Sequence, residues 1–80
     1  MRKAVFKKYT KKGFYKFEFE DGVIMDFDDV TPKVLAKFDL KNNKELRDSA
    51  FNVIFTEQQD RKNEDLVIYT IENLKFLEDD

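Results

Sequence analysis

The chain has 80 residues, with 41% hydrophobic and 40% charged side chains, a formal net charge of −2, nine Phe, no Cys and no His. These values predict one small soluble domain, residues 1–80, built around an aromatic core. They exclude disulfides, thiolate chemistry and any site that needs His as a base or metal ligand, so we expect no enzyme activity, no cofactor and no metal site. The apolar runs are too short for a membrane span or a signal peptide, so we expect a cytoplasmic protein without membrane contact.

A first strand is predicted over about residues 3–10, with a turn at residues 11–13. Its apolar side chains lie on both sides, with Val5 and Tyr9 on one side and Ala4 and Phe6 on the other. Such a two-sided strand is typical of one shared between two sheets, where a barrel closes.

The next two strands form a hairpin around Gly22. Large side chains alternate before and after the turn, at Tyr15, Phe17, Phe19, Val23, Met25 and Phe27. A two-residue loop would mix the two faces of the hairpin. A three-residue loop places Phe17 opposite Met25 and Lys16 opposite Asp26, with Gly22 in the left-handed conformation. We therefore predict the three-residue loop.

A short helix is predicted to begin at Thr31-Pro32, with Thr31 or Asp29 as its N-cap and Pro32 in the first turn. Its apolar stripe consists of Val34, Leu35 and Phe38, and it ends near residues 39–40. Residues 41–49 form a polar connector, with Leu46 as its only apolar anchor.

A further strand is predicted over residues 51–56, where Phe51, Val53 and Phe55 alternate with other residues. Residues 57–65 have no apolar side chain, so we expect a mobile loop. The last strand begins at Leu66, and its apolar positions change parity near residues 72–73, which indicates a bulge. The acidic end, residues 78–80, is expected to fray. Phe17 and Phe55, at the centres of their strands, are predicted to be core residues.

The predicted order is three strands, a short helix and two strands. Five short strands with this many aromatics bury them best in a small closed barrel, which also removes the exposed strand edges. We therefore predict a mainly β fold with one short helix, arranged as a five-stranded OB-fold-like barrel. A Src-homology-3-like barrel is the alternative.

Two resemblances rest on particular segments. Residues 66–77, ending Ile-Glu-Asn-Leu-Lys-Phe-Leu, resemble the closing strand of OB domains, including bacterial single-stranded-DNA-binding proteins. The segments 17–23, 32–40, 51–57 and 71–74 together look like small uncharacterised bacterial proteins of OB-like architecture, a likeness that covers residues 14–77. It implies a bacterial barrel and is silent about its activity.

The two signs of charge are segregated along the chain. Residues 1–17 carry seven basic and no acidic side chains, whereas residues 18–80 carry a charge of −9. Two interpretations are open. The later acidic strands neutralise the basic first strand, or the basic segment keeps a local positive field that attracts a charged partner.

The densest acidic cluster contains Asp26, Asp28 and Asp29, with Glu20 and Asp21 nearby. Its spacing departs from the calcium-loop pattern, which would place Gly at Thr31 and an acid near Lys37. Asp26 and Asp28 share the outward face of a strand, and Asp29 suits the start of the helix. We therefore predict a solvated face and a helix cap rather than a metal site.

Two binding functions remain as expectations. The first is a protein-interaction module with an unidentified partner, since small barrels often bind through an exposed edge or loop and the acidic majority suits a basic partner. The alternative is single-stranded nucleic acid, which OB barrels bind with stacking aromatics and flanking basic residues. The residues predicted for that interface surround the first turn and are Tyr9, Lys11, Lys12, Phe14 and Lys16.

Overall fold

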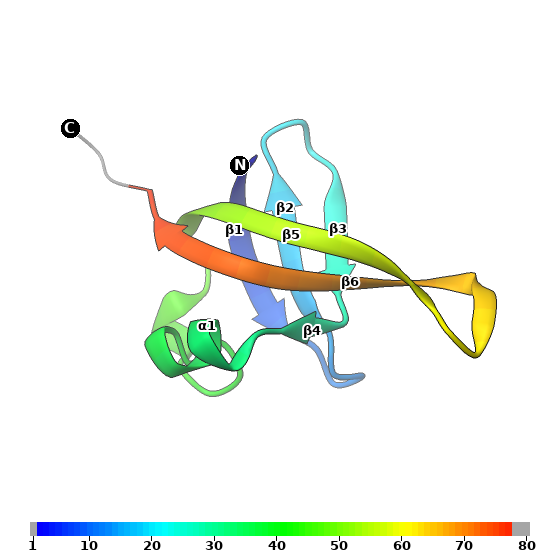
Figure 1. Ribbon diagram of the computed structural model, residues 1–80. Helices are drawn as coiled ribbons and strands as arrows, with labels where there is room; N and C mark the ends of the chain where they lie inside the picture. Colours follow the sequence, from blue (N-terminus) through cyan, green and yellow to red (C-terminus); the bar gives the residue numbers. More distant parts are fainter. Residues whose placement is uncertain (1, 78–80) are drawn as a thin grey trace.

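The computed structural model describes residues 2–77, which form one six-stranded sheet and a short helix (Figure 1). The strands are β1 (Arg2–Tyr9), β2 (Tyr15–Phe19), β3 (Ile24–Phe27), β4 (Asp29–Val30), β5 (Ala50–Asp60) and β6 (Asn63–Phe76). The helix is α1 (Pro32–Lys37), and a 3-10 turn covers Lys44–Leu46. The acidic end that was expected to fray, residues 78–80, lies outside the described residues.

The strand order in the sheet is β3-β2-β1-β5-β6-β4, and only the β4–β6 pair is parallel. The prediction of a mainly β fold with one short helix is confirmed. The sheet is not closed, so the predicted five-stranded barrel, whether OB-like or Src-homology-3-like, is not confirmed. The strand missing from the prediction is β4, whose two residues are too few to produce a recognisable alternation.

The β2–β3 hairpin has the predicted register. Tyr15 pairs with Phe27, Lys16 with Asp26 and Phe17 with Met25. The Phe19 amide donates to the Val23 carbonyl at 2.8 Å, which closes a three-residue loop. Gly22 has a φ of 85°, the left-handed conformation that glycine adopts without a steric penalty. Alternation and one glycine are therefore enough to predict this element.

A bulge in β1 explains its two-sided apolar pattern. The pairing with β2 shifts between Phe6 and Lys8, so that Phe6 lies opposite Phe17 and Tyr9 lies opposite Tyr15. The extra residue restores Tyr9 to the core face on which Phe6 lies. The prediction that β1 joins two sheets is wrong, since it lies within one sheet between β2 and β5.

The start of α1 differs from the prediction in its capping. Thr31 occupies the N-cap position, but its hydroxyl donates to the Glu72 carbonyl at 3.4 Å instead of accepting from a helix amide. The Asp29 carboxylate accepts from the Val30 amide at 2.9 Å. Neither side chain caps the helix: the Thr31 hydroxyl bonds to β6, and the Asp29 carboxylate bonds to the adjacent amide. The predicted stripe is confirmed, with Val34 and Phe38 buried and Leu35 partly buried.

The expected mobile loop at residues 57–65 is instead a continuation of two paired strands. Glu57 pairs with Tyr69, and pairing extends to Asp60 and Asn63 around a turn at residues 61–62. Backbone hydrogen bonds between strands need no apolar side chains, so the polar composition did not reveal this pairing. Figure 1 shows the resulting β5–β6 hairpin projecting beyond the rest of the sheet.

The predicted bulge in the last strand is confirmed. Ile54 pairs with Asn73 and Phe55 pairs with Ile71, which leaves Glu72 as the extra residue of β6. Because of this extra residue, Ile71 and Leu74 can both lie in the core, where each is almost fully buried. The change of parity in the sequence is thus the direct signature of the bulge.

The core is an aromatic cluster between the core face of the sheet and α1. Its buried side chains are Ala4, Phe6, Tyr15, Phe17, Phe19, Phe27, Val30, Val34, Phe38, Leu40, Phe51, Val53, Ile71 and Leu74. Phe17 is 0% exposed, which confirms its prediction. Phe55 is only half-buried, because it lies where the β5–β6 hairpin leaves the sheet, with its ring 5.1 Å from that of Phe27.

Candidate nucleic-acid interface

The turn between β1 and β2 is held by hydrogen bonds to Thr10. The Thr10 amide donates to the Phe14 carbonyl at 2.7 Å, and the Gly13 amide donates to the Thr10 carbonyl at 3.0 Å. The Thr10 hydroxyl also accepts from the Phe14 amide at 3.0 Å. Gly13 has a φ of 92°, so this turn needs glycine there. These hydrogen bonds fix the backbone of the turn, and so they fix the positions from which its side chains project.

A hollow of about 480 Å³ lies beside this turn, on the outer face of β1, β2 and β3. We call it the basic hollow, and its lining residues are Lys8, Thr10, Lys11, Lys12, Phe14, Lys16 and Asp26. The structure therefore brings together four of the five predicted residues, with half-buried Phe14 among the lysines. Lys8, Thr10 and Asp26 were not predicted for the interface. The predicted β2–β3 register, which pairs Lys16 with Asp26, was sufficient to place Asp26 there, whereas the pairing of Lys8 with Lys16 depends on the bulge in β1.

Tyr9 is the predicted residue that does not reach the basic hollow. The bulge in β1 turns it to the core face, where its ring lies 4.9 Å from that of Tyr15. The Lys41 ammonium lies 5.7 Å from the centre of the Tyr9 ring. Burial, followed by the nearby Tyr9 and the negative charge of Asp29, raises the pKa of the Tyr15 hydroxyl above its ordinary value. Tyr9 is therefore part of the packing around the turn.

The other half of the basic segment is paired with acids, as one interpretation of the charge pattern expected. The ion pairs are Arg2 with Asp21 at 3.6 Å, Lys3 with Glu20 at 4.0 Å, Lys7 with Glu18 at 3.9 Å and Lys7 with Asp48 at 2.9 Å. The hydrogen bond from Lys7 to Asp48, followed by the attraction of the two charges, raises the pKa of Lys7. The positive charges of Arg2, Lys3 and Lys7 are therefore neutralised by neighbouring acidic side chains.

The four lysines of the basic hollow make no ion pair with any residue of 2–77. Lys8 and Lys16 also lie directly opposite each other across β1 and β2, an arrangement of like charges that destabilises a sheet. The positive field of the first 17 residues is therefore concentrated in the basic hollow. A charge arrangement that costs stability is a stronger indication of binding than basic composition alone.

This cost can be measured with Lys8→Thr. Removing one member of the like-charged pair is expected to raise the free energy of unfolding by about 0.2–1 kcal/mol in low salt. The gain should shrink in 0.5 M salt, because exposed charges are screened. Urea denaturation at both salt concentrations measures it, with Lys12→Thr in the turn as the control. A Lys8→Thr variant no more stable than the parent in low salt would show that the pair has no cost.

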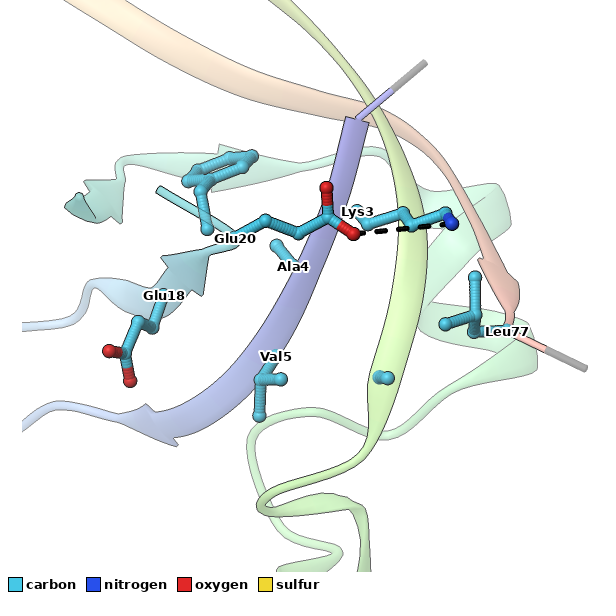
Figure 2. A pocket seen from close by; sticks show the side chains of 8 residues that line it. Lys3, Ala4, Val5, Glu18, Glu20 and Leu77 are labelled. Carbon is cyan, nitrogen blue, oxygen red and sulfur yellow. Dashed lines mark ion pairs between the residues drawn. The ribbon is translucent and has the colours of Figure 1, made fainter. Parts of the chain in front are cut away.

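A second hollow, of about 240 Å³, lies along β1 near the start of β5 (Figure 2). Its charged lining residues are Lys3, Glu18 and Glu20, and the last of these forms the ion pair with Lys3 that Figure 2 marks. Glu18 is in turn paired with Lys7. Ala4, Val5 and Leu77 supply apolar surface. With its charges compensated, this hollow lacks the field that distinguishes the basic hollow.

Among residues 2–77, no group of three or more acidic side chains is placed to hold a metal ion. In the cluster expected to form a solvated face and cap, Asp28 accepts from the Tyr69 amide at 2.9 Å and Asp29 accepts from the Val30 amide. Asp26 is exposed on the outer face, as predicted, and there it lines the basic hollow. No polar or charged side chain of the described residues is buried.

No helix within residues 2–77 is long and apolar enough to cross a membrane.

No family model matches the chain, and comparisons with curated proteins and with solved structures find no match. The resemblance to bacterial OB-like proteins therefore stays a prediction. The candidate interface rests on the geometry and charge of the basic hollow alone.

Proposed function

We propose that the chain binds single-stranded nucleic acid in the basic hollow, on a sheet of OB-like arrangement. The observation that carries the proposal is the set of four lysines without ion pairs in residues 2–77, gathered around half-buried Phe14. Ammonium groups bind phosphates as point charges, and an aromatic ring offers a stacking surface for a base. The basic hollow combines both elements on one face.

The strand connectivity supports the OB-like arrangement. Only Asp28 separates β3 from β4, although these strands lie at opposite ends of the strand order. The Asp28 amide donates to the Tyr69 carbonyl at 3.0 Å, and β4 then pairs with β6 in parallel. The chain itself therefore links the two edges of the sheet. In partly open OB folds, the ligand lies on the face of the second and third strands, beside the loop between the first two. The basic hollow lies on the face of β1, β2 and β3 beside the β1–β2 turn, which supports this comparison.

Lysine-rich contacts of this kind predict strong salt dependence and little sequence preference from the phosphates. Binding of four phosphates to a single strand releases counterions, so log K is expected to fall with log salt at a slope of about −2.8. Stacking on one aromatic ring contributes about 1–3 kcal/mol per base. The contributions of phosphate contacts and of stacking can be measured separately, because salt weakens mainly the phosphate contacts.

The test is a fluorescence anisotropy titration of a labelled oligo-dT between 50 and 200 mM salt. Phe14→Leu is expected to weaken binding by about 1–3 kcal/mol without changing the salt slope, since it removes the ring and leaves the lysines. Leu66→Ala, at an exposed position of β6, is the control. A dissociation constant weaker than about 100 μM at 50 mM salt, or a slope near zero, would contradict the proposal.

Protein binding remains the second candidate, favoured by apolar side chains that the β5–β6 hairpin leaves exposed. Leu66 is 50% exposed, Ile54 is 41% exposed and Val67 is 37% exposed. Exposed apolar groups on a projecting two-stranded hairpin suit a protein surface better than a nucleic acid. If the oligonucleotide titration shows no binding, this hairpin becomes the leading candidate interface.

A further inference from the structure

Among residues 2–77, Asp26 is the one carboxylate that lines the basic hollow, and phosphate binding does not account for it. Its side chain is exposed, and it makes no ion pair with any residue of 2–77 although its strand position is opposite Lys16. A carboxylate repels phosphate, so an interface for the backbone alone gains nothing from it. If Asp26 takes part in binding, it must therefore contact a part of the ligand other than the phosphates.

The register places Asp26 at the end of a row across three strands. Lys8 pairs with Lys16, and Lys16 pairs with Asp26. Phe14 immediately precedes β2 and Lys16 is its second residue, and both side chains line the basic hollow. Phe14 and Asp26 line the same hollow. A base stacked on Phe14, with its phosphates at the lysines of β1 and the turn, would therefore occupy the hollow that Asp26 of β3 also lines.

A carboxylate at that place accepts hydrogen bonds and donates none. The Watson–Crick edge of guanine has two neighbouring donors, N1–H and the 2-amino group, which match the two oxygens of a carboxylate. Adenine and cytosine offer an amino group beside an acceptor nitrogen, and thymine and uracil offer one N–H between two carbonyls. Those acceptors would face the carboxylate unfavourably, because a carboxylate has only lone pairs to present.

We propose that Asp26 makes the basic hollow selective for guanine in single-stranded nucleic acid, by accepting from guanine N1–H and its 2-amino group. The inference rests on the proposed function and adds base selectivity to it. Single-stranded bases are recognised in this way at their Watson–Crick edges, which duplexes hide. Two charge-assisted hydrogen bonds at an exposed site are expected to favour guanine over thymine by about 5- to 10-fold.

The test compares three eight-nucleotide probes by anisotropy in 50 mM salt. They are oligo-dT, oligo-dT with one central guanine, and the same probe with hypoxanthine in place of guanine. A single guanine prevents quadruplex formation. We expect the guanine probe to bind about 5- to 10-fold more tightly than oligo-dT, and hypoxanthine, which lacks the 2-amino group, to lose most of that gain.

The Asp26→Asn variant gives a second, independent test, because it is expected to change the preference for guanine and the affinity for oligo-dT in opposite directions. It is expected to weaken binding of the guanine probe relative to oligo-dT, and to strengthen binding of oligo-dT because it removes a negative charge. Asp65→Asn makes the same chemical change at an exposed position of β6 and should change neither ratio. Circular dichroism checks that both variants are folded, and the hypoxanthine comparison needs no variant.

The outcomes separate this inference from the proposed function. If the parent binds the three probes equally, or if Asp26→Asn retains the guanine preference, guanine selectivity by Asp26 is wrong while the basic hollow still binds single strands. If none of the three probes binds, the proposed function fails and the inference fails with it. Loss of the preference in Asp26→Asn, together with tighter oligo-dT binding, supports both.

Discussion

Phe17→Ala is expected to cost about 3–5 kcal/mol, enough to leave the protein marginally folded or unfolded at room temperature. The ring of Phe17 is 0% exposed and lies 5.2 Å from Phe6, 5.6 Å from Phe27 and 6.4 Å from Phe51, measured between ring centres. Removing it opens a cavity among rings that belong to four strands of the sheet. A chain of 80 residues has a total stability of only about 4–12 kcal/mol.

Urea denaturation followed by circular dichroism measures this loss, and two other variants calibrate it. Ile24→Ala, at a side chain that is 58% exposed, should change stability by no more than about 0.5 kcal/mol. Phe55→Ala should fall between the two, because Phe55 is only half-buried. A loss below 1 kcal/mol for Phe17→Ala, in a cooperative transition, would mean that the core face has been misassigned.

The second large effect is expected on oligonucleotide binding, when the lysines that have no ion pair within residues 2–77 are removed and the result is compared with removal of the paired basic residues. Changing Lys8, Lys11 and Lys12 to Gln should lower the salt slope of oligonucleotide binding by about 2 and weaken binding at 50 mM salt by more than about tenfold. These lysines have no acid partner within residues 2–77, so their charge is available to phosphates.

The matched control removes the same number of positive charges from the compensated end of β1. Arg2, Lys3 and Lys7 changed to Gln lose ion pairs between exposed groups, which are worth little for stability. Their effect on the salt slope should be small, because these charges are already neutralised by Asp21, Glu20, Glu18 and Asp48. Equal losses in the two triple variants would indicate attraction by overall charge, with no specific site in the basic hollow.

The candidate site was partly predictable. Lys11, Lys12, Phe14 and Lys16 are close in the sequence, and they stay close because one turn connects them. Lys8 was missed because its place depends on the β1–β2 register and its bulge, whereas Asp26 was missed although the predicted β2–β3 register already placed it opposite Lys16. It was not predictable either which lysines have no acidic partner within residues 2–77. Lys7 is neutralised by Asp48, 41 residues away, and no local pattern records such a contact.

Local sequence by itself determined the β2–β3 register, the left-handed glycine and the bulge at Glu72, because alternation with period two and turn chemistry act between near neighbours. Only the tertiary structure decided the features that depend on distant partners. The polar residues 57–60 and 63–65 became paired strands because each strand satisfies the backbone groups of the other. The bulge in β1 turned Tyr9 to the core, and the parallel β4–β6 pair linked the sheet edges without closing it, because both depend on where separate strands meet.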